Sequence, residues 1–376
     1  MLEEVLFVLA LFACQSPLDE SIDGGIRRLE GVVTTRGNGF RTLDIDVGDE
    51  DAMIVTAQTL GNGELVHVRQ LVDPDGAVVY DAEDWFEPAD EQKTNAGFLA
   101  TVSSLNWPVS ADDPPLRPGR WSALIGQTDA EGAFVGGDVE VDVVFKTDPD
   151  FDSGRLRVVI LRSENEDPGL EVALDQAKAI WSDLYAPAGI TLDFEDWITT
   201  FADLAPPTTG DPRYTEIAES TGIRTVVVAL VDSIDTESLG VDPDIGEIVG
   251  LAGGIPGAAS ATPRSAVQVS TLGAAGTDGR FDGDDIRLLA ETMAHETAHY
   301  LGLFHPVEAL ARGTPWSVFD ALSDTPRCGS RRACETRLGT NLMFPFPVCE
   351  PGASCDPQEV ITEEQATVMQ RYVGVD

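Results

Sequence analysis

The hydrophobic positions between about residues 25 and 144 follow the alternation that is typical of half-buried β-strands. Apolar and polar residues alternate clearly in three runs, at residues 43–47, 65–71 and 139–143. Residues 73–76 (Asp-Pro-Asp-Gly) lie between two such runs and have the composition of a tight turn. Residues 117–121 open another strand. Roughly seven or eight candidate strands without helical periodicity predict an antiparallel β-sandwich.

The pattern changes after residues 146–154, a polar stretch with Pro and Gly that predicts a domain boundary. Residues 168–185 place apolar side chains at helical spacing, and a second helix begins near Asp284 and runs to about Leu301. Strand candidates lie at residues 156–161, 190–194, 225–231 and 266–270. A strand, a helix, several strands and a second helix indicate a mixed α+β domain.

The chain begins with a short apolar run. Residues 5–13 (VLFVLALFA) are long enough for the core of a signal peptide and too short to span a bilayer. The Leu-Phe-Ala that ends this run precedes Cys14 and resembles the lipobox of bacterial lipoproteins, in which the cysteine is lipidated. We therefore interpret residues 1–20 as a signal and short tether. The chain is expected to be exported, as an outer-membrane or cell-surface lipoprotein anchored through Cys14, or as a secreted protein.

The other cysteines, Cys328, Cys334, Cys349 and Cys355, lie together near the C-terminus. An even set of four beside one lipid acceptor predicts two disulfides in an oxidising compartment. Three pairings are possible, and the sequence does not choose among them. A four-thiolate zinc site is the alternative, although the cysteines lack the tight C-x-x-C spacing of zinc knuckles.

Charge narrows the classes of partner. Asp and Glu number 65 against 24 Lys and Arg, which gives a net charge of −41. Such a surface repels nucleic acid and anionic lipid, so we expect no nucleic-acid partner. Apolar residues make up 43% of the chain, the balance of a globular protein. Composition leaves the oligomeric state open.

Candidate chemistry is concentrated in the segment from His295 to His305, which reads His-Glu-Thr-Ala-His-Tyr-Leu-Gly-Leu-Phe-His. His295 and His299 are four residues apart on a predicted helix, so both imidazoles project from one face toward a single ion. His305 would point about 240° away from His299 if the helix continued. Gly302 can end the helix, because glycine adopts the left-handed conformation at little cost. All three histidines are therefore predicted to bind one metal ion.

One catalytic Zn²⁺ is the cofactor that this donor set favours, since three neutral histidines leave the fourth tetrahedral position open to water. Glu296 follows the first ligand, where its carboxylate can take a proton from that water and return it to a leaving amine. The chain has four histidines. The fourth, His67, lies in a β run and is predicted to point to solvent.

The pattern H-E-x-x-H-x-x-G-x-x-H resembles the signature of the metzincin metallopeptidases. That family also has a methionine in a tight turn below the zinc, and Met343 fits this Met-turn in position. The resemblance implies that residues 155–376 form a catalytic domain with a twisted mixed sheet and an active-site helix. Preceded by an all-β sandwich at residues 21–148, this is an α+β architecture.

Within the metzincins, residues 285–373 are most similar to the pappalysins. The shared segments are residues 301–305 (LGLFH), 324–326 (DTP), 341–343 (NLM), Cys349 and residues 362–365 (TEEQ). This resemblance implies a metalloendopeptidase whose protein or peptide substrate pairs, in extended form, with an edge strand. Residues 248–254 are our candidate for that edge, and specificity pockets are expected between His305 and Cys349. Pro345 stands where many metzincins have a tyrosine near the zinc.

Several alternatives stay open on the sequence. The chain could be a binding or adhesion lipoprotein with a vestigial zinc domain, or a zinc hydrolase that acts on something other than peptides. The sandwich is either an accessory module or a removable inhibitory prosegment. Four aspartates before the active-site helix could bind Ca²⁺, as in some relatives, or cap the helix: Asp278, Asp282, Asp284 and Asp285.

Overall fold

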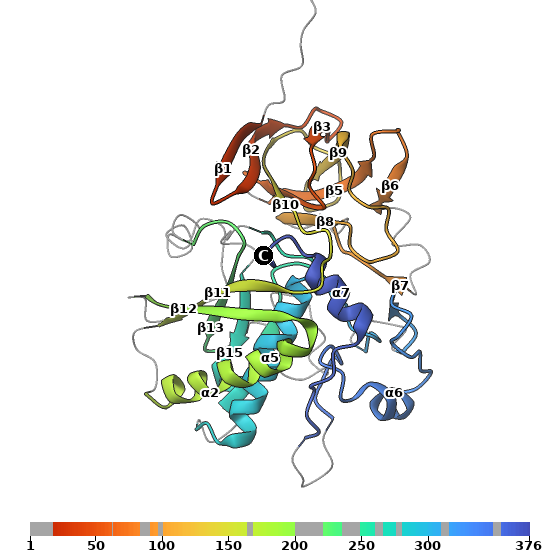
Figure 1. Ribbon diagram of the computed structural model, residues 1–376. Coiled ribbons are helices and arrows are strands. Elements are labelled where there is room, and N and C mark those ends of the chain that lie inside the picture. Colours follow the sequence, from red (N-terminus) through yellow and green to blue (C-terminus); the bar gives the residue numbers. More distant parts are fainter. Residues whose placement is uncertain are drawn as a thin grey trace, which may run out of the picture.

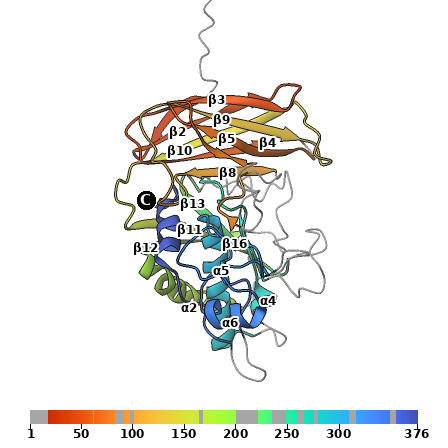
Figure 2. The same ribbon diagram turned by 90° about the vertical axis from the view of Figure 1, so that its right-hand side faces the viewer.

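Two antiparallel sheets form the N-terminal part of the protein (Figures 1 and 2). The structure is a computed structural model that describes residues 18–61, 63–82, 91–96, 101–163, 168–199, 221–234, 249–259, 266–275, 280–309, 316–348 and 355–376. One sheet has the strand order β1-β2-β10-β4-β8 and the other has the order β3-β9-β5-β6. The strands of these sheets are Asp19–Asp23 (β1), Ile26–Thr34 (β2), Phe40–Val47 (β3), Ala52–Thr59 (β4), Leu65–Val72 (β5), Val78–Asp81 (β6), Val102–Trp107 (β8), Gly119–Thr128 (β9) and Asp138–Lys146 (β10). The short strand Glu91–Gln92 (β7) belongs to neither sheet and pairs in parallel with Phe319–Asp320 (β16) of the second part.

The alternating runs at residues 43–47, 65–71 and 139–143 lie in β3, β5 and β10, as predicted. The expectation that His67 points to solvent is wrong, because its side chain is only 3% exposed. His67 pairs with Gly126 across β5 and β9, and a Cβ atom at Gly126 would lie 2.4 Å from the imidazole. The missing side chain at Gly126 gives the ring room to fold over the neighbouring strand. Burial lowers the pKa of His67 to about 4.

The second part of the chain is built on a five-stranded sheet with the order β12-β11-β13-β15-β14. The first four strands are parallel, and β14 runs antiparallel at one edge. Its elements are Gly154–Ser163 (β11), Pro168–Tyr185 (α2), Ala186–Ala188 (η1), Ile190–Thr199 (β12), Thr225–Val231 (β13), Gly250–Leu251 (β14), Val267–Ser270 (β15), Thr271–Ala275 (α4), Gly283–Tyr300 (α5), Phe319–Asp320 (β16), Arg331–Leu338 (α6) and Glu363–Arg371 (α7). The molecule is therefore mixed α+β, as the sequence predicts.

Helices α2 and α5 pack together on one face of this sheet (Figure 1). The amphipathic pattern of α2 explains this arrangement, because its buried stripe includes Leu170, Ala177 and Trp181. The phenolic hydroxyl of Tyr185, the last residue of α2, donates to the carbonyl of Ala294 in α5 at 2.7 Å. The helix that carries two of the histidines is thus held by contacts with both the sheet and α2.

The sandwich and the second part share a hydrogen-bonded interface. The side-chain amide of Asn106 in β8 donates to the carbonyl of Arg371 at 2.9 Å and its oxygen accepts from the amide of Val373 at 2.8 Å. Lys146 was predicted to belong to a polar linker, but it ends β10 and is 2% exposed. Its ammonium donates to the carbonyl of Gln370 at 2.8 Å. Buried apolar side chains of both parts belong to one continuous cluster.

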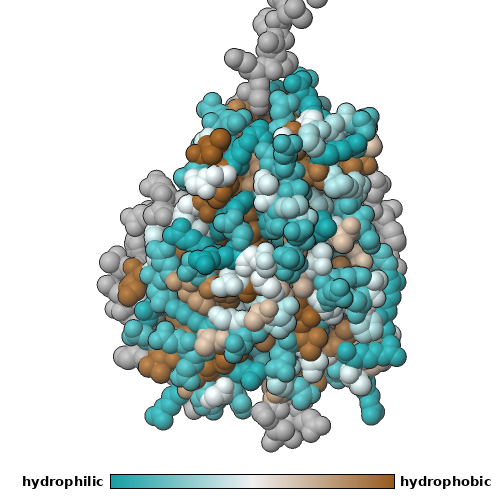
Figure 3. All heavy atoms as spheres, viewed as in Figure 1, coloured by the Kyte–Doolittle hydropathy of each residue, from teal (hydrophilic) through white to brown (hydrophobic). Residues whose placement is uncertain are grey.

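Hydrophilic residues cover most of the face shown in Figure 3, and hydrophobic residues lie between them in separate patches. This surface agrees with a net charge of −41. Among the described residues, no helix combines the length and the apolar character that crossing a membrane requires. Residues 1–17, including the apolar run and Cys14, lie outside the described part of the chain.

Candidate metal centre

Helix α5 begins with a capping box that fixes its first turn. The carboxylate of Asp282 accepts from the amides of Asp284 and Asp285 at 2.9 and 3.2 Å, and the carboxylate of Asp285 accepts from the amide of Asp282 at 2.9 Å. Two of the four aspartates considered as calcium ligands therefore take part in capping. Asp278 lies outside the described residues.

The helix ends where the sequence predicts. Tyr300 is its last residue, and Gly302 has a φ of 110°, in the left-handed region that glycine tolerates. The amide of Leu303 donates back to the carbonyl of Ala298 at 3.0 Å, which closes the turn. This reversal brings His305 back toward His295 and His299.

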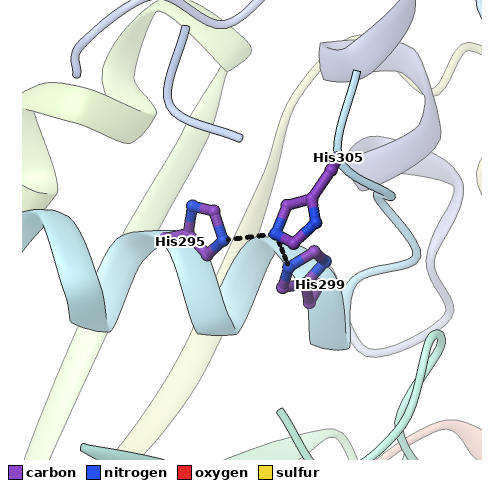
Figure 4. A group of neighbouring side chains, drawn as sticks. All are labelled: His295, His299 and His305. Atoms are coloured by element: carbon purple, nitrogen blue, oxygen red, sulfur yellow. Dashed lines mark hydrogen bonds between the residues drawn. The ribbon is translucent and has the colours of Figure 1, made fainter. Parts of the chain in front are cut away.

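The three imidazoles meet at one point (Figure 4). The Nε2 atom of His305 lies 3.2 Å from the Nε2 atoms of both His295 and His299. Their potential ligand atoms all lie within 4.8 Å of one another, and among the described residues this is the group that converges in this way. The three histidines could hold a metal ion.

The protonation of each ring follows from the partner of its Nδ1 atom. Nδ1 of His295 is 2.7 Å from the carbonyl of Leu342, and Nδ1 of His299 is 2.6 Å from the carbonyl of Leu303. Nδ1 of His305 is 3.0 Å from a carboxylate oxygen of Glu308. Because these oxygens only accept, each Nδ1 carries the proton and donates it. With Nδ1 as the donor, the Nε2 atom of each ring is the one left to bind a metal, and the three Nε2 atoms face one another.

Electrostatics favours the neutral forms of His295 and His299. Burial lowers the pKa of His295 to about 3 and that of His299 well below its ordinary value, and the neighbouring imidazoles lower both further. Converging lone pairs repel one another unless a cation lies between them. Nitrogen ligands at about 2.0–2.1 Å in a tetrahedral arrangement stand ~3.4 Å apart. The two separations from Nε2 of His305, both 3.2 Å, are close to that spacing, and three imidazole nitrogens are donors that suit zinc.

Glu296 lies beside the triad, against the edge strand β14. A Cβ atom at Gly250 would lie 2.4 Å from Cγ of Glu296, so only glycine lets the strand approach this closely. The carboxylate accepts a hydrogen bond from the backbone of Ala252. Part of the Glu296 side chain stays accessible, but dense surrounding protein desolvates it and raises its pKa to about 8.

Comparisons with known proteins give little beyond this geometry. No protein-family model and no curated protein matches the chain. The solved structure of metalloproteinase-II from Bacteroides fragilis is 12% identical over 81% of this chain and 82% of that one, with a TM-score of 0.27. A family two carbohydrate esterase from Cellvibrio japonicus is 8% identical over 54% of this chain and 68% of that one, with a TM-score of 0.12. Likenesses of this size carry no argument about function, so the interpretation depends on the residues of the site.

Met343 is fully buried directly after the residue that orients His295. Its amide donates to the side-chain oxygen of Asn341 at 2.9 Å. Asn341 and Gln365 exchange two buried hydrogen bonds, at 2.9 and 3.2 Å. The segments 341–343 and 362–365, which the sequence singled out separately, are thus parts of one structure. This structure holds the carbonyl of Leu342 within hydrogen-bonding distance of Nδ1 of His295.

The structure describes three of the four C-terminal cysteines, and all three are disulfide-bonded. Cys328 and Cys334 form a disulfide, which excludes a site made of four thiolates. Cys355 is also disulfide-bonded, and Cys349 lies outside the described residues. The Cys328–Cys334 bond braces the segment between His305 and the Met343 turn.

Three contacts of the site were not foreseen from the sequence: those of Glu308, of the Leu342 carbonyl and of Gly250. An acidic residue three positions after a histidine ligand is a usable signal for a carboxylate that orients the ring. The other two contacts depend on segments far apart in the sequence, because Leu342 follows His295 by 47 residues. Only the folded chain shows them.

Replacing Glu308 with glutamine is expected to lower metal affinity about 10–100-fold, because the neutral amide polarises and orients the His305 ring less strongly. Titration of the metal-free protein with zinc against a chelating dye measures the change. Glu359→Gln, at an exposed carboxylate, is the matched control and should bind as the unmodified chain does. Equal affinities for all three proteins would contradict the assigned role.

Proposed function

We propose that the chain is an exported zinc-dependent metalloendopeptidase of the metzincin class, with pappalysin-like features in its C-terminal part. The observation that carries the proposal is the convergence of three Nε2 lone pairs next to a carboxylate, at the edge of a sheet. This arrangement combines a metal-binding site, an acid–base residue and a place for an extended peptide.

The triad His295, His299 and His305 would hold the zinc. Zinc bound there supplies Lewis-acid chemistry toward a peptide carbonyl and a water molecule. The carbonyls of Leu342 and Leu303 and the carboxylate of Glu308 keep the three rings in the required tautomer.

Glu296 acts as the acid–base residue in this proposal. Its carboxylate accepts a proton from the attacking water as the new C–O bond forms, and it gives that proton to the amine nitrogen as the C–N bond breaks. Desolvation raises the pKa of Glu296 to about 8 in the metal-free site, and a cation held by the three histidines would lower this pKa and favour the ionised form that takes the proton. The hydrogen bond from the backbone of Ala252 fixes the orientation of the group.

Strand β14 offers the place for the substrate. It pairs with β15 on one side and has no paired strand on the other among the described residues. An extended peptide can add to such an edge through main-chain hydrogen bonds. Beside the triad, a pocket of about 60 Å³ can receive a substrate side chain. Its lining is mainly apolar and includes Val249, Leu288 and residues 344–347, so we expect an apolar residue next to the cleaved bond.

Export is supported by the Cys328–Cys334 disulfide, since such bonds persist in oxidising compartments. We propose that the apolar residues 5–13 direct export and that Cys14 provides a lipid anchor. Mass spectrometry of the exported protein tests this proposal. A mature chain that starts at Cys14 with a lipid mass increment is the expected result, and a cytoplasmic protein that keeps Met1 would contradict it.

The peptidase activity is tested with purified protein, casein and a peptide library, each with and without a chelator. We expect cleavage that the chelator abolishes and that added zinc restores. Mass spectrometry of the products identifies the residue beside each cleaved bond. Zinc-loaded protein that cleaves no peptide in a chelator-sensitive way would refute the proposed function.

A further inference from the structure

Residues 255–258, here called the bridging segment, follow the edge strand β14 and contact both parts of the molecule. They lie four residues beyond Leu251, the end of β14, and are joined to it by residues 252–254. Ala252 in that connection contributes the backbone hydrogen bond to Glu296. The position of the bridging segment therefore affects the position of the donor that orients Glu296.

On one side the bridging segment is held by Asn95 of the sandwich. The amide of Asn95 donates to the carbonyl of Ile255 at 2.9 Å, and the amide of Ile255 donates to the side-chain oxygen of Asn95 at 3.0 Å. Asn95 thus satisfies both backbone polar groups of Ile255, as a neighbouring strand would. The hydroxyl of Thr94 adds a longer hydrogen bond to the same carbonyl, at 3.4 Å.

Asn95 is itself attached firmly to the sandwich. The carbonyl of the next residue, Ala96, accepts from the amide of Val68 at 3.1 Å and from the hydroxyl of Ser103 at 2.5 Å. These residues belong to β5 and β8, so they lie on strands of both sheets. A displacement of Asn95 would disturb paired strands, which makes it a rigid support.

On the other side the bridging segment is attached to the end of the metal-binding helix. The amide of Gly257 donates to the carbonyl of Tyr300 at 2.9 Å, and the hydroxyl of Tyr300 donates to the carbonyl of Ala258. A Cβ atom at Gly257 would lie 2.1 Å from the ring of Tyr300, so the backbone lies directly on that ring. Tyr300 follows His299, and the hydroxyl of Tyr372 donates to the carbonyl of Gly257 at 3.0 Å.

The sandwich also lines the space next to the substrate edge. Residues 101–104, at the start of β8, and residues 251–254 line a common cavity of about 250 Å³. The strand of the sandwich and the edge strand of the peptidase sheet therefore face the same space. A peptide that lies along β14 would have a wall contributed by the sandwich.

We propose that Asn95 is a positioning residue of the active site and that the sandwich is a retained part of the peptidase, not a prosegment that is released. The inference rests on the proposed function for its catalytic part. Release of the sandwich would leave both backbone groups of Ile255 unpaired. It would also remove Asn106 and Lys146 from the carbonyl and amide groups of residues 370–373. Unpaired polar groups of this kind cost more than the hydrogen bonds themselves contribute.

The test uses the full chain with Asn95→Leu, which removes the side-chain acceptor at similar volume, and Asn95→Asp, which keeps an acceptor oxygen. Asn38→Leu, at an exposed turn of the sandwich, is the matched control. Hydrogen exchange of residues 250–259 is measured in the metal-free proteins. We expect the amide of Ile255 to exchange about tenfold faster in Asn95→Leu, as the loss of one hydrogen bond predicts. Asn95→Asp and Asn38→Leu should exchange as the unmodified chain does.

Kinetics with a peptide cleaved by the unmodified chain completes the test. Asn95→Leu is expected to lower kcat/KM about tenfold with unchanged zinc content, through a higher KM because the edge for the substrate is displaced and a lower kcat because the Ala252 donor no longer orients Glu296 as well. Asn95→Asp should restore the activity. Unchanged exchange at Ile255, or an active species whose intact mass lacks the sandwich, would overturn the inference. An unmodified chain without activity would refute the proposed function, while the exchange data would still decide whether Asn95 positions the segment.

Discussion

Glu296→Gln is expected to lower kcat/KM by about 10²–10⁴-fold while zinc stays bound at the stoichiometry of the unmodified chain. Glutamine has nearly the same shape, and it can still accept the hydrogen bond from the backbone of Ala252. It cannot take a proton from water at neutral pH, so only the acid–base step is lost. Cleavage rates with a fluorogenic peptide, together with metal analysis of the same sample, measure both quantities.

The control for this prediction is Glu363→Gln, which makes the same change at an exposed residue of α7. It should keep full activity. Cleavage by Glu296→Gln at the rate of the unmodified chain would show that another group moves the proton. Loss of zinc along with activity would show instead that Glu296 is needed to form the metal site.

His305→Ala is expected to abolish the stabilisation that zinc gives to the folded chain. A ligand that binds only the folded state at 100 times its Kd adds about 2.7 kcal/mol, which raises the Tm of a protein of this size by several degrees. Removal of a residue that only orients a ligand lowers metal affinity about 10–100-fold. Removal of the ligand itself should lower the zinc affinity of the two remaining histidines by much more. Thermal unfolding with and without zinc measures the effect.

His67 provides the matched control for His305. His67→Gln is expected to lower the Tm with and without zinc, because the buried imidazole packs over Gly126, and it should leave the zinc-dependent shift intact. In the metal-free state His305→Ala should cost little stability, since it removes one of three lone pairs that repel one another. A zinc shift that persists in His305→Ala would contradict the assignment of this ligand.

The sequence predicts those features that depend on local pattern. Helix α2 and strand β13 have the expected bounds, and Gly302 ends α5 because its conformational freedom is a property of the residue itself. His67 was placed wrongly, because the period of two does not reveal that its partner across the strand is a glycine. Lys146 was likewise assigned to a linker, although its stem is buried and its ammonium reaches the carbonyl of Gln370.

The metal centre also divides into features that local sequence predicts and features that depend on distant contacts. The spacing of three histidines, a glutamate and a glycine predicts the ligand group, because these residues interact through one helix and one turn. The hydrogen bonds that select the tautomer come from Leu342 and Glu308, and the support for the substrate edge comes from Asn95. Asn95 and Ile255 are 160 residues apart, and no local pattern relates them. Long-range contacts of this kind required the folded structure.

The shortness of β14 has a consequence for self-association. A sheet edge that accepts extended peptides can also accept the same edge of a second copy, and long exposed edges promote aggregation. The edge strand described here has two residues, and glycines follow it at positions 253 and 254. Two copies that paired through it would gain few hydrogen bonds. A peptide in the cleft would gain those bonds together with contacts in the neighbouring pocket, so the edge discriminates against aggregation while it stays available to substrate.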